Sequence, residues 1–125
     1  MNMFVRFGSI CLLAFSSAAA AQNMPLQTFL SKGEALNKKG PLALFSGDLK
    51  LLKREMQASA NQLKAERLAA VKAGKRPAYC APNGTPLSSD EILAHFRSIP
   101  PAARARMTSK DGFRSLMVKK HPCPK

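Results

Sequence analysis

The chain has 125 residues, with 20 lysines and arginines against 7 aspartates and glutamates, which gives a formal net charge of +13. This length is enough for one small domain and excludes a multidomain enzyme. The positive charge attracts anionic partners and repels cationic ones, which excludes cationic ligands. The same charge is also typical of a solvated lysine-rich surface with no dedicated partner.

Residues 1–21 have the pattern of a secretory signal peptide. Arg6 supplies the positive charge, and the apolar stretch up to Phe15 is far shorter than the roughly 18–20 residues that span a bilayer. Small side chains then suit a signal peptidase, and the predicted cleavage site consists of Ala19, Ala21 and Gln22. We therefore expect a periplasmic protein whose mature chain has no transmembrane segment and remains strongly basic.

The first predicted helix runs from about Leu26 to Lys39. Its apolar residues recur at the three- and four-residue spacing of one helical face. Gly33 lies on this face, where it either lets another backbone approach closely or weakens the helix. Gly40 and Pro41 end the helix, because glycine suits the C-terminal cap and proline cannot continue a helix. The next four residues form a compact apolar turn.

A long basic helix is predicted from about Leu49 to Ala73. Five residues at helical spacing define its buried stripe: Leu49, Leu52, Met56, Ala60 and Leu63. Beyond Leu63 the stripe thins to alanine and valine among charged residues. We expect the part of the helix after Leu63 either to cover a partner or to protrude into solvent. A protruding helix is tolerable there because alanine and lysine both favour helix.

The C-terminal part of the chain carries the clearest helix start signals. Ser88 and Glu91 form a predicted capping box, in which each side chain binds the backbone of the other residue. That helix ends at a pair of prolines, and one more helical turn follows it. Thr108 and Asp111 form a second box-like pattern at the start of the last helix, which Pro122 ends.

These elements predict an all-α fold, a small domain of about four helices in which one disulfide ties the C-terminal helical pair. The long basic helix belongs to an N-terminal helical region over residues 22–79, and the disulfide closes a helical module over residues 80–125. Cys80 and Cys123 pair in an oxidising compartment, since Cys11 lies in the predicted leader. Chain entropy then predicts roughly 3–4 kcal/mol of stabilisation.

Metal binding and catalysis are the alternatives for the same residues. A metal site would use two cysteines and two histidines whose spacing matches no usual zinc pattern: Cys80, His95, His121 and Cys123. The two histidines fall in different predicted elements, and no serine or free thiol stands out as a nucleophile beside either. We therefore predict no catalytic residues, no cofactor and no metal, and so no enzyme.

The C-terminal module opens with Cys-Ala-Pro-Asn-Gly-Thr-Pro-Leu-Ser and closes with Met-Val-Lys-Lys-His-Pro-Cys, with two short helices and a proline followed by basic residues between them. In this order of features, residues 80–123 resemble the C-terminal half of the Rap/Tai-type immunity proteins. These small periplasmic helical proteins neutralise type VI secretion amidase effectors. The resemblance implies a non-enzymatic binding protein with Cys80 and Cys123 joined as a disulfide. Upstream, the Lys-rich helix stands where the family has a second cysteine pair.

Two functions are expected. The first is an immunity-type inhibitor that blocks the active cleft of an acidic effector with a convex helical surface. The second is an envelope protein that binds anionic lipid or cell-wall polymer, or has only a structural role there. Nucleic acid is not expected as the partner, because the chain carries an export signal. Candidate partner contacts are Lys53, Lys64, Arg67, Tyr79, Arg104 and Arg106. For Tyr79, packing over the disulfide or the end of the long helix is favoured over a contact role.

Overall fold

A computed structural model describes residues 24–82 and 84–125. The predicted leader and Cys11 lie outside the described residues, as does the cleavage site at Ala19, Ala21 and Gln22. Apart from one isolated bridge, the described residues form helices and no strand, which confirms the predicted all-α fold. None of these helices combines the length and the apolarity that crossing a membrane requires.

Five α-helices and one 3₁₀ helix make up the described part of the chain. In order they are α1 (Leu26–Lys39), η2 (Gly40–Phe45), α2 (Gly47–Lys72), α3 (Ser89–Ser98), α4 (Pro101–Arg104) and α5 (Ser109–Lys120). The four longer helices are the predicted four, and α4 is the extra turn expected after the proline pair. Helix α2 begins earlier than predicted, because Ser46 caps it by accepting a hydrogen bond from the backbone N–H of Asp48 at 3.3 Å.

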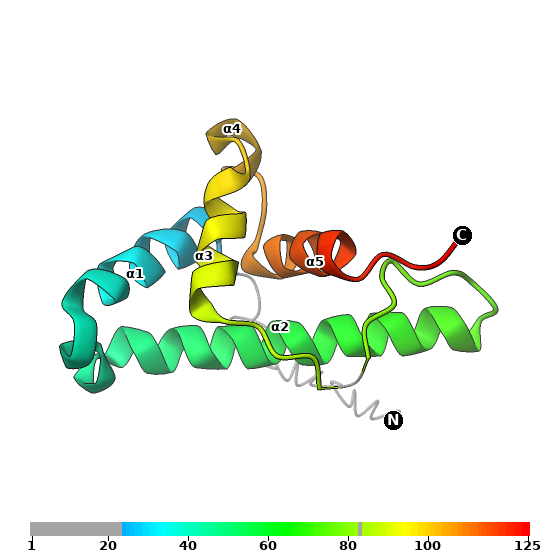
Figure 1. The fold of residues 1–125 in the computed structure, drawn as a ribbon, viewed down its shortest axis with the longest axis horizontal. Helices are drawn as coiled ribbons and strands as arrows, with labels where there is room; N and C mark the ends of the chain where they lie inside the picture. Colours follow the sequence, from blue (N-terminus) through cyan, green and yellow to red (C-terminus); the bar gives the residue numbers. More distant parts are fainter. Residues whose placement is uncertain (1–23, 83) are drawn as a thin grey trace, which may run out of the picture.

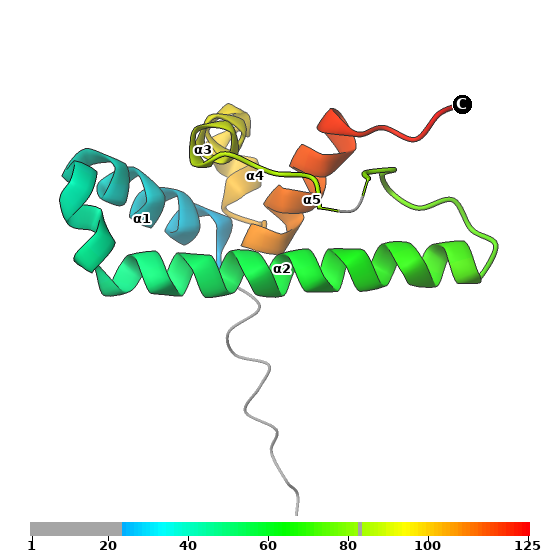
Figure 2. The same ribbon diagram turned by 60° about the horizontal axis from the view of Figure 1, so that its bottom comes forward.

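Helix α2 is the long base on which the other helices are assembled (Figures 1 and 2). Both views show α1 along the N-terminal half of α2, with α5 against its middle. Helix α3 packs on α1 and α5, and α4 lies at the far end of α3 from α2 (Figure 1). The C-terminal half of α2 extends past α5, and residues 73–82 return beside it (Figures 1 and 2).

The predicted helix starts are present, with one difference. Thr108 and Asp111 form both halves of a capping box at the start of α5. At α3 the Ser88 hydroxyl accepts a hydrogen bond from the backbone N–H of Glu91 at 3.1 Å. The Glu91 carboxylate also forms an ion pair with Lys120 at 2.9 Å, because the C-terminal end of α5 lies alongside the start of α3. The hydrogen bond from Lys120, and after it the contact with the Ser88 backbone, lowers the pKa of Glu91, so this residue has an ion-pair partner that the predicted box did not include.

Three phenylalanine rings from three helices form the centre of the core. Phe29 of α1, Phe96 of α3 and Phe113 of α5 contact one another edge to face, with ring centroids between 5.2 and 5.6 Å apart. Such pairs contribute about 0.5–1.5 kcal/mol beyond the apolar area that they bury. The core draws on helices before and after residue 80, so residues 22–79 and residues 80–125 share one hydrophobic interior.

Two glycines let the helices approach closely. A Cβ atom at Gly33 of α1 would lie 2.7 Å from Cδ2 of the buried Leu93 in α3. A Cβ atom at Gly112 of α5 would lie 2.8 Å from Cδ1 of the buried Leu26 in α1. At Gly33 the close neighbour is therefore the Leu93 side chain and not the backbone that was predicted to approach there.

The buried face of α2 follows the predicted stripe at four of its five residues: Leu49, Leu52, Met56 and Leu63 lie in the core or pack against it. At the centre of the face Ala60 is exposed, whereas Glu55 and Ser59 are buried at 2% and 1% exposure. Glu55 accepts two hydrogen bonds through Oε1, one from the Met24 backbone N–H at 3.1 Å and one from the Ser109 hydroxyl at 2.7 Å. A buried carboxyl group is tolerated when hydrogen bonds satisfy it. An apolar pattern cannot reveal a stripe whose centre is polar, so the prediction was wrong there.

The disulfide between Cys80 and Cys123 is present. Hydrogen bonds reinforce it on both sides. The Cys80 backbone N–H donates to the His121 carbonyl at 2.9 Å, and the Arg76 guanidinium donates to the carbonyls of Cys123 at 2.8 Å and Pro124 at 2.7 Å. The bridge therefore joins the chain end after α5 to the segment that returns from α2.

We expect Glu55→Ala to lower the free energy of unfolding by about 2–5 kcal/mol, because two buried donors lose their acceptor. Glu55→Gln keeps an acceptor of the same shape and should cost less. Urea denaturation followed by circular dichroism measures both. Glu34→Ala is the matched control, since the exposed Glu34–Arg97 pair at 2.7 Å should contribute less than about 1 kcal/mol. Equal losses in Glu55→Ala and Glu34→Ala would contradict the structural role of Glu55.

Loss of the disulfide in the double variant Cys80→Ser, Cys123→Ser should cost about 3–4 kcal/mol of stability, because the bridge closes a long loop. Helix α2 should remain helical, while the returning loop and the chain end become sensitive to protease. Limited proteolysis with mass mapping measures this, with oxidised wild-type protein as the reference. The same cleavage pattern and rate in both proteins would show that the bridge has no such role.

Candidate functional site

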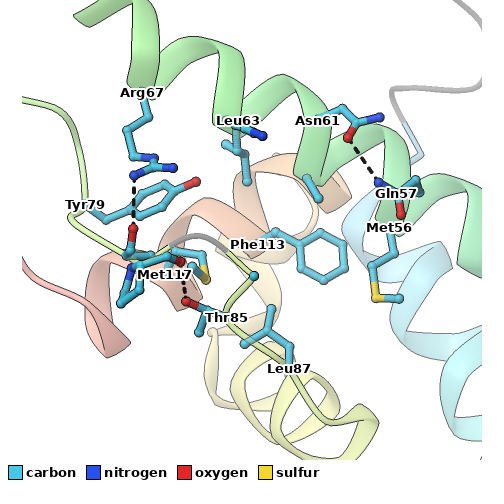
Figure 3. A pocket seen from close by; sticks show the side chains of 15 residues that line it. Met56, Gln57, Asn61, Leu63, Arg67, Tyr79, Thr85, Leu87, Phe113 and Met117 are labelled. Carbon is cyan, nitrogen blue, oxygen red and sulfur yellow. Dashed lines mark hydrogen bonds between the residues drawn. The ribbon is translucent and has the colours of Figure 1, made fainter. Parts of the chain in front are cut away.

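A groove of about 320 Å³ lies between α2 and the loop segments 79–82 and 84–87 (Figure 3). Its floor is apolar and is formed by Leu63 of α2 with Phe113 and Met117 of α5. Leu63 and Phe113 also belong to the buried core, so the floor is held rigidly from behind. A floor of this kind favours apolar side chains and offers them no competing polar partner.

The rim of the groove on the α2 side is polar and basic. Gln57 and Asn61 lie one turn apart, and the Gln57 amide donates a hydrogen bond to Oδ1 of Asn61 at 3.1 Å (Figure 3). Lys64 and Arg67 continue the rim, because residues three and four apart share one helical face. None of the described residues that line the groove is acidic. The rim therefore complements negative charge.

The opposite wall of the groove is the loop, which is fixed by hydrogen bonds. The Arg67 guanidinium donates to the Ala81 carbonyl at 3.0 Å, which holds the loop against α2 (Figure 3). Within the loop, the Thr85 hydroxyl donates to the Pro82 carbonyl at 2.6 Å. Prolines keep this segment out of helix, and the disulfide anchors its start. These contacts hold the described parts of the wall against α2.

Tyr79 supports the wall from inside. Its side chain is 7% exposed and lies beside Arg67 in Figure 3. Burial raises the pKa of the Tyr79 phenol, since the phenolate would be poorly solvated there. Of the two alternatives for this residue, packing is the one that agrees with its burial.

An ionic cluster behind the groove binds α2 to α5. The Glu66 carboxylate pairs with Arg114 and with Lys110, each at 2.8 Å, and Arg114 also pairs with Asp111 at 3.0 Å. The hydrogen bond from Arg114, followed by that from Lys110, lowers the pKa of Glu66. Glu66 is therefore ionised and engaged by α5. Part of the second half of α2 thus packs on the domain, although Leu68 and other apolar residues there remain exposed.

The structure gathers only half of the candidate partner contacts. Lys64, Arg67 and Tyr79 meet at the groove. Lys53 lies at a second groove of about 530 Å³ between α1, α2 and α3. The remaining two, Arg104 and Arg106, lie on and just after α4, at the opposite end of α3 from the loop.

Sequence reasoning missed the amides of the rim and the residues of the floor. Gln57 and Asn61 form an i,i+4 pair followed three residues later by Lys64, which is a detectable polar face of one helix. Phe113 and Met117 have the sequence signal of ordinary core residues, and only the tertiary arrangement places them beneath a groove.

The prediction that no nucleophile lies near a histidine is wrong for His95. Nε2 of His95 in α3 lies 2.9 Å from the hydroxyl oxygen of Ser115 in α5. Burial, followed by the charge of Lys119, lowers the pKa of His95, which favours the neutral imidazole. Nδ1 of His95 is buried without a hydrogen-bond partner among the described residues, so the third group that orients a catalytic histidine is missing there.

The alternative of a cysteine–histidine metal site is left without sulfur ligands. Cys80 and Cys123 are bonded to each other, and a disulfide sulfur is not the thiolate that zinc requires. Within residues 24–82 and 84–125, no cluster of three or more histidine, cysteine, aspartate or glutamate residues is arranged to hold a metal ion.

Comparison with protein-family models, with curated proteins and with solved structures finds no match to this chain. The fold and the groove therefore define the class of protein by themselves. It is a small all-α domain, closed by one disulfide, with a basic groove over an apolar floor.

The half-buried His95 should make stability depend on pH. Because its folded pKa is lower than the ordinary value of 6.5, the unfolded chain binds the proton more tightly. The free energy of unfolding should therefore fall as pH decreases from about 6.5 through the folded pKa, and should be constant above that range. Urea midpoints from pH 7.5 downward measure this, and His95→Gln should flatten the slope. The Glu66 carboxylate loses its contribution only below its ordinary pKa of 4.5, so the two effects separate. A wild-type slope retained in His95→Gln would contradict the assignment.

Proposed function

We propose that this protein is an exported, non-enzymatic binding protein whose basic groove receives an acidic segment of a protein partner. The observation that carries the proposal is the pairing of an apolar floor with a rim that bears Lys64 and Arg67 and no acidic lining residue among those described. Complementary charge steers association and selects against basic partners. The high net charge of +13 acts in the same direction.

The partner that we propose is a periplasmic effector, which the protein inhibits by binding. Residues 80–123 resemble the Rap/Tai-type immunity proteins, and this segment supplies both the loop wall and the α5 floor of the groove. Inhibition of this kind needs no catalytic group, because occupying the partner's active cleft is sufficient. The exposed length of α2 beside the groove is the convex element that would enter such a cleft (Figure 2).

The groove alone is too small to be the whole interface. Its volume of about 320 Å³ accepts only a few side chains, whereas a stable complex buries roughly 800 Å² on each partner. The exposed face of α2 therefore has to contribute, while the groove provides the anchor at the centre. A rigid, preformed anchor pocket is typical of tight inhibitors because little ordering entropy is lost on binding.

An envelope component is the competing partner. Exposed cations extend along α2 on both sides of Lys64 at the groove rim: Lys50, Lys53, Arg54 and Lys72. Such a row would hold anionic lipid or cell-wall polymer in a manner that salt abolishes. The apolar floor of the groove distinguishes a protein partner from an envelope polymer. A polymer bound by the cations along α2 does not need an apolar contact.

To test the proposal, the protein encoded beside this gene is captured from periplasmic extract and its Kd for the purified chain is measured directly. We expect Lys64→Glu to weaken binding at least about tenfold, mainly through slower association, because it reverses the charge at the rim. Lys72→Glu is the matched control, since it makes the same charge change at an exposed position of α2 outside the groove. It should leave Kd nearly unchanged.

Three outcomes would overturn the proposal. The first is no binding at micromolar concentration. The second is an equal loss in Lys64→Glu and Lys72→Glu, which would indicate only a general charge effect. The third is competition by isolated cell wall or by anionic vesicles that displaces the captured protein completely.

A further inference from the structure

The 3₁₀ helix η2 exposes three large apolar side chains in one turn. Leu42 and Leu44 are each 71% exposed, and Phe45 is 88% exposed. Figures 1 and 2 show η2 at one end of the molecule, where it connects α1 to the start of α2. Scattered apolar residues are normal on a protein surface, but a contiguous group marks a contact surface.

The local sequence prevents this turn from burying its side chains. Gly40 caps the end of α1 with a φ of +59° and is the first residue of η2, and Pro41 lies in the first turn of this 3₁₀ helix. With three residues in each turn, only one position in three faces inward. Ala43 takes that position and packs on the core. Leu42 and Leu44 are left on either side of it and point away from the domain.

Positive charge surrounds the exposed turn. Lys38 and Lys39 are exposed in the last turn of α1, and Lys50 is exposed in the first turn of α2. Residues 35–47 include no acidic side chain. The next carboxylate along the chain, Asp48, is paired with Lys32 at 2.9 Å. The nearest acid before the turn, Glu34, is likewise paired, with Arg97 at 2.7 Å, so the lysines on either side of the turn keep a net positive charge.

We propose that η2 attaches the protein to an anionic phospholipid bilayer, with Leu42, Leu44 and Phe45 in the interfacial region and the flanking lysines on the headgroups. Apolar side chains beside lysines are the combination that binds such interfaces, through buried area together with charge attraction. A second copy of the chain is disfavoured as the occupant, because two tips with the same lysines repel each other. The attachment does not rest on the proposed protein partner, since the groove lies farther along α2 and stays accessible.

The experiment uses tryptophan as a local probe, because the chain contains no tryptophan of its own. Phe45→Trp places the probe on η2, and Leu68→Trp places it on the C-terminal half of α2, where the side chain is 54% exposed. Fluorescence is recorded with vesicles containing about one-third phosphatidylglycerol and with pure phosphatidylcholine vesicles. We expect a blue shift and quenching by brominated lipid for Phe45→Trp with the anionic vesicles only, and neither for Leu68→Trp.

The charge requirement is tested in the same assay. Replacing Lys38, Lys39 and Lys50 with glutamine in the Phe45→Trp background should raise the lipid concentration for half-maximal binding at least about tenfold, because each lysine near the surface adds attraction. A matched variant replaces three exposed lysines elsewhere: Lys64, Lys72 and Lys75. The lipid concentration for half-maximal binding should rise clearly less in this variant.

The attachment is overturned by any of three results. One is an unshifted Phe45→Trp spectrum with the anionic vesicles. Another is an equal shift of the Phe45→Trp and Leu68→Trp probes, which means that the surface adsorbs without η2 entering the lipid. The last is a Phe45→Trp emission spectrum that is already blue-shifted without lipid, together with a doubled molecular mass in solution. That result would assign the turn to contact between two copies of the chain. None of these results alters the Kd test of the groove, so failure of one proposal is distinguishable from failure of the other.

Discussion

The carboxyl group of Glu55 is the interaction on which the rest of the structure depends. It lies buried in the middle of α2 and accepts hydrogen bonds from the start of the described chain and from the first residue of α5. Backbone hydrogen bonds from Leu26 to Met107 at 3.0 Å and from Ser109 to Met24 at 2.8 Å join the same two segments. A buried acceptor tolerates few arrangements of its donors, so it determines where α1 and α5 sit on α2.

The position of α5 then determines the groove. Phe113 and Met117 form its floor only because α5 crosses the middle of α2, and the Glu66 ion pairs keep it there. The disulfide and Arg67 hold the loop as the facing wall. Helix α2 consequently separates two surfaces, the basic groove along its middle and the apolar turn η2 at its beginning. One domain therefore offers a protein partner and a bilayer two surfaces that do not overlap.

Local signals predicted the helices well and the contacts between them poorly. The Thr108–Asp111 capping box and the glycine–proline stop after Lys39 lie where expected, since caps depend on neighbours in the chain. The pairing of Glu91 with Lys120 was not predicted, and no serine was expected beside His95, which contacts Ser115. Each of these contacts involves a partner more than fifteen residues away, which no local pattern reports.

The sequence by itself determined the all-α class, the helix limits, the cationic character and the pairing of Cys80 with Cys123, because these follow from local periodicity, capping chemistry and composition. Only the tertiary structure decided that Glu55 is buried, that Lys64 and Arg67 border an apolar floor, and that the turn at Phe45 faces outward. The physical reason is that burial and complementarity belong to surfaces assembled from distant segments. The sequence around a polar residue at the centre of such a surface looks the same as the sequence around a polar residue exposed to water.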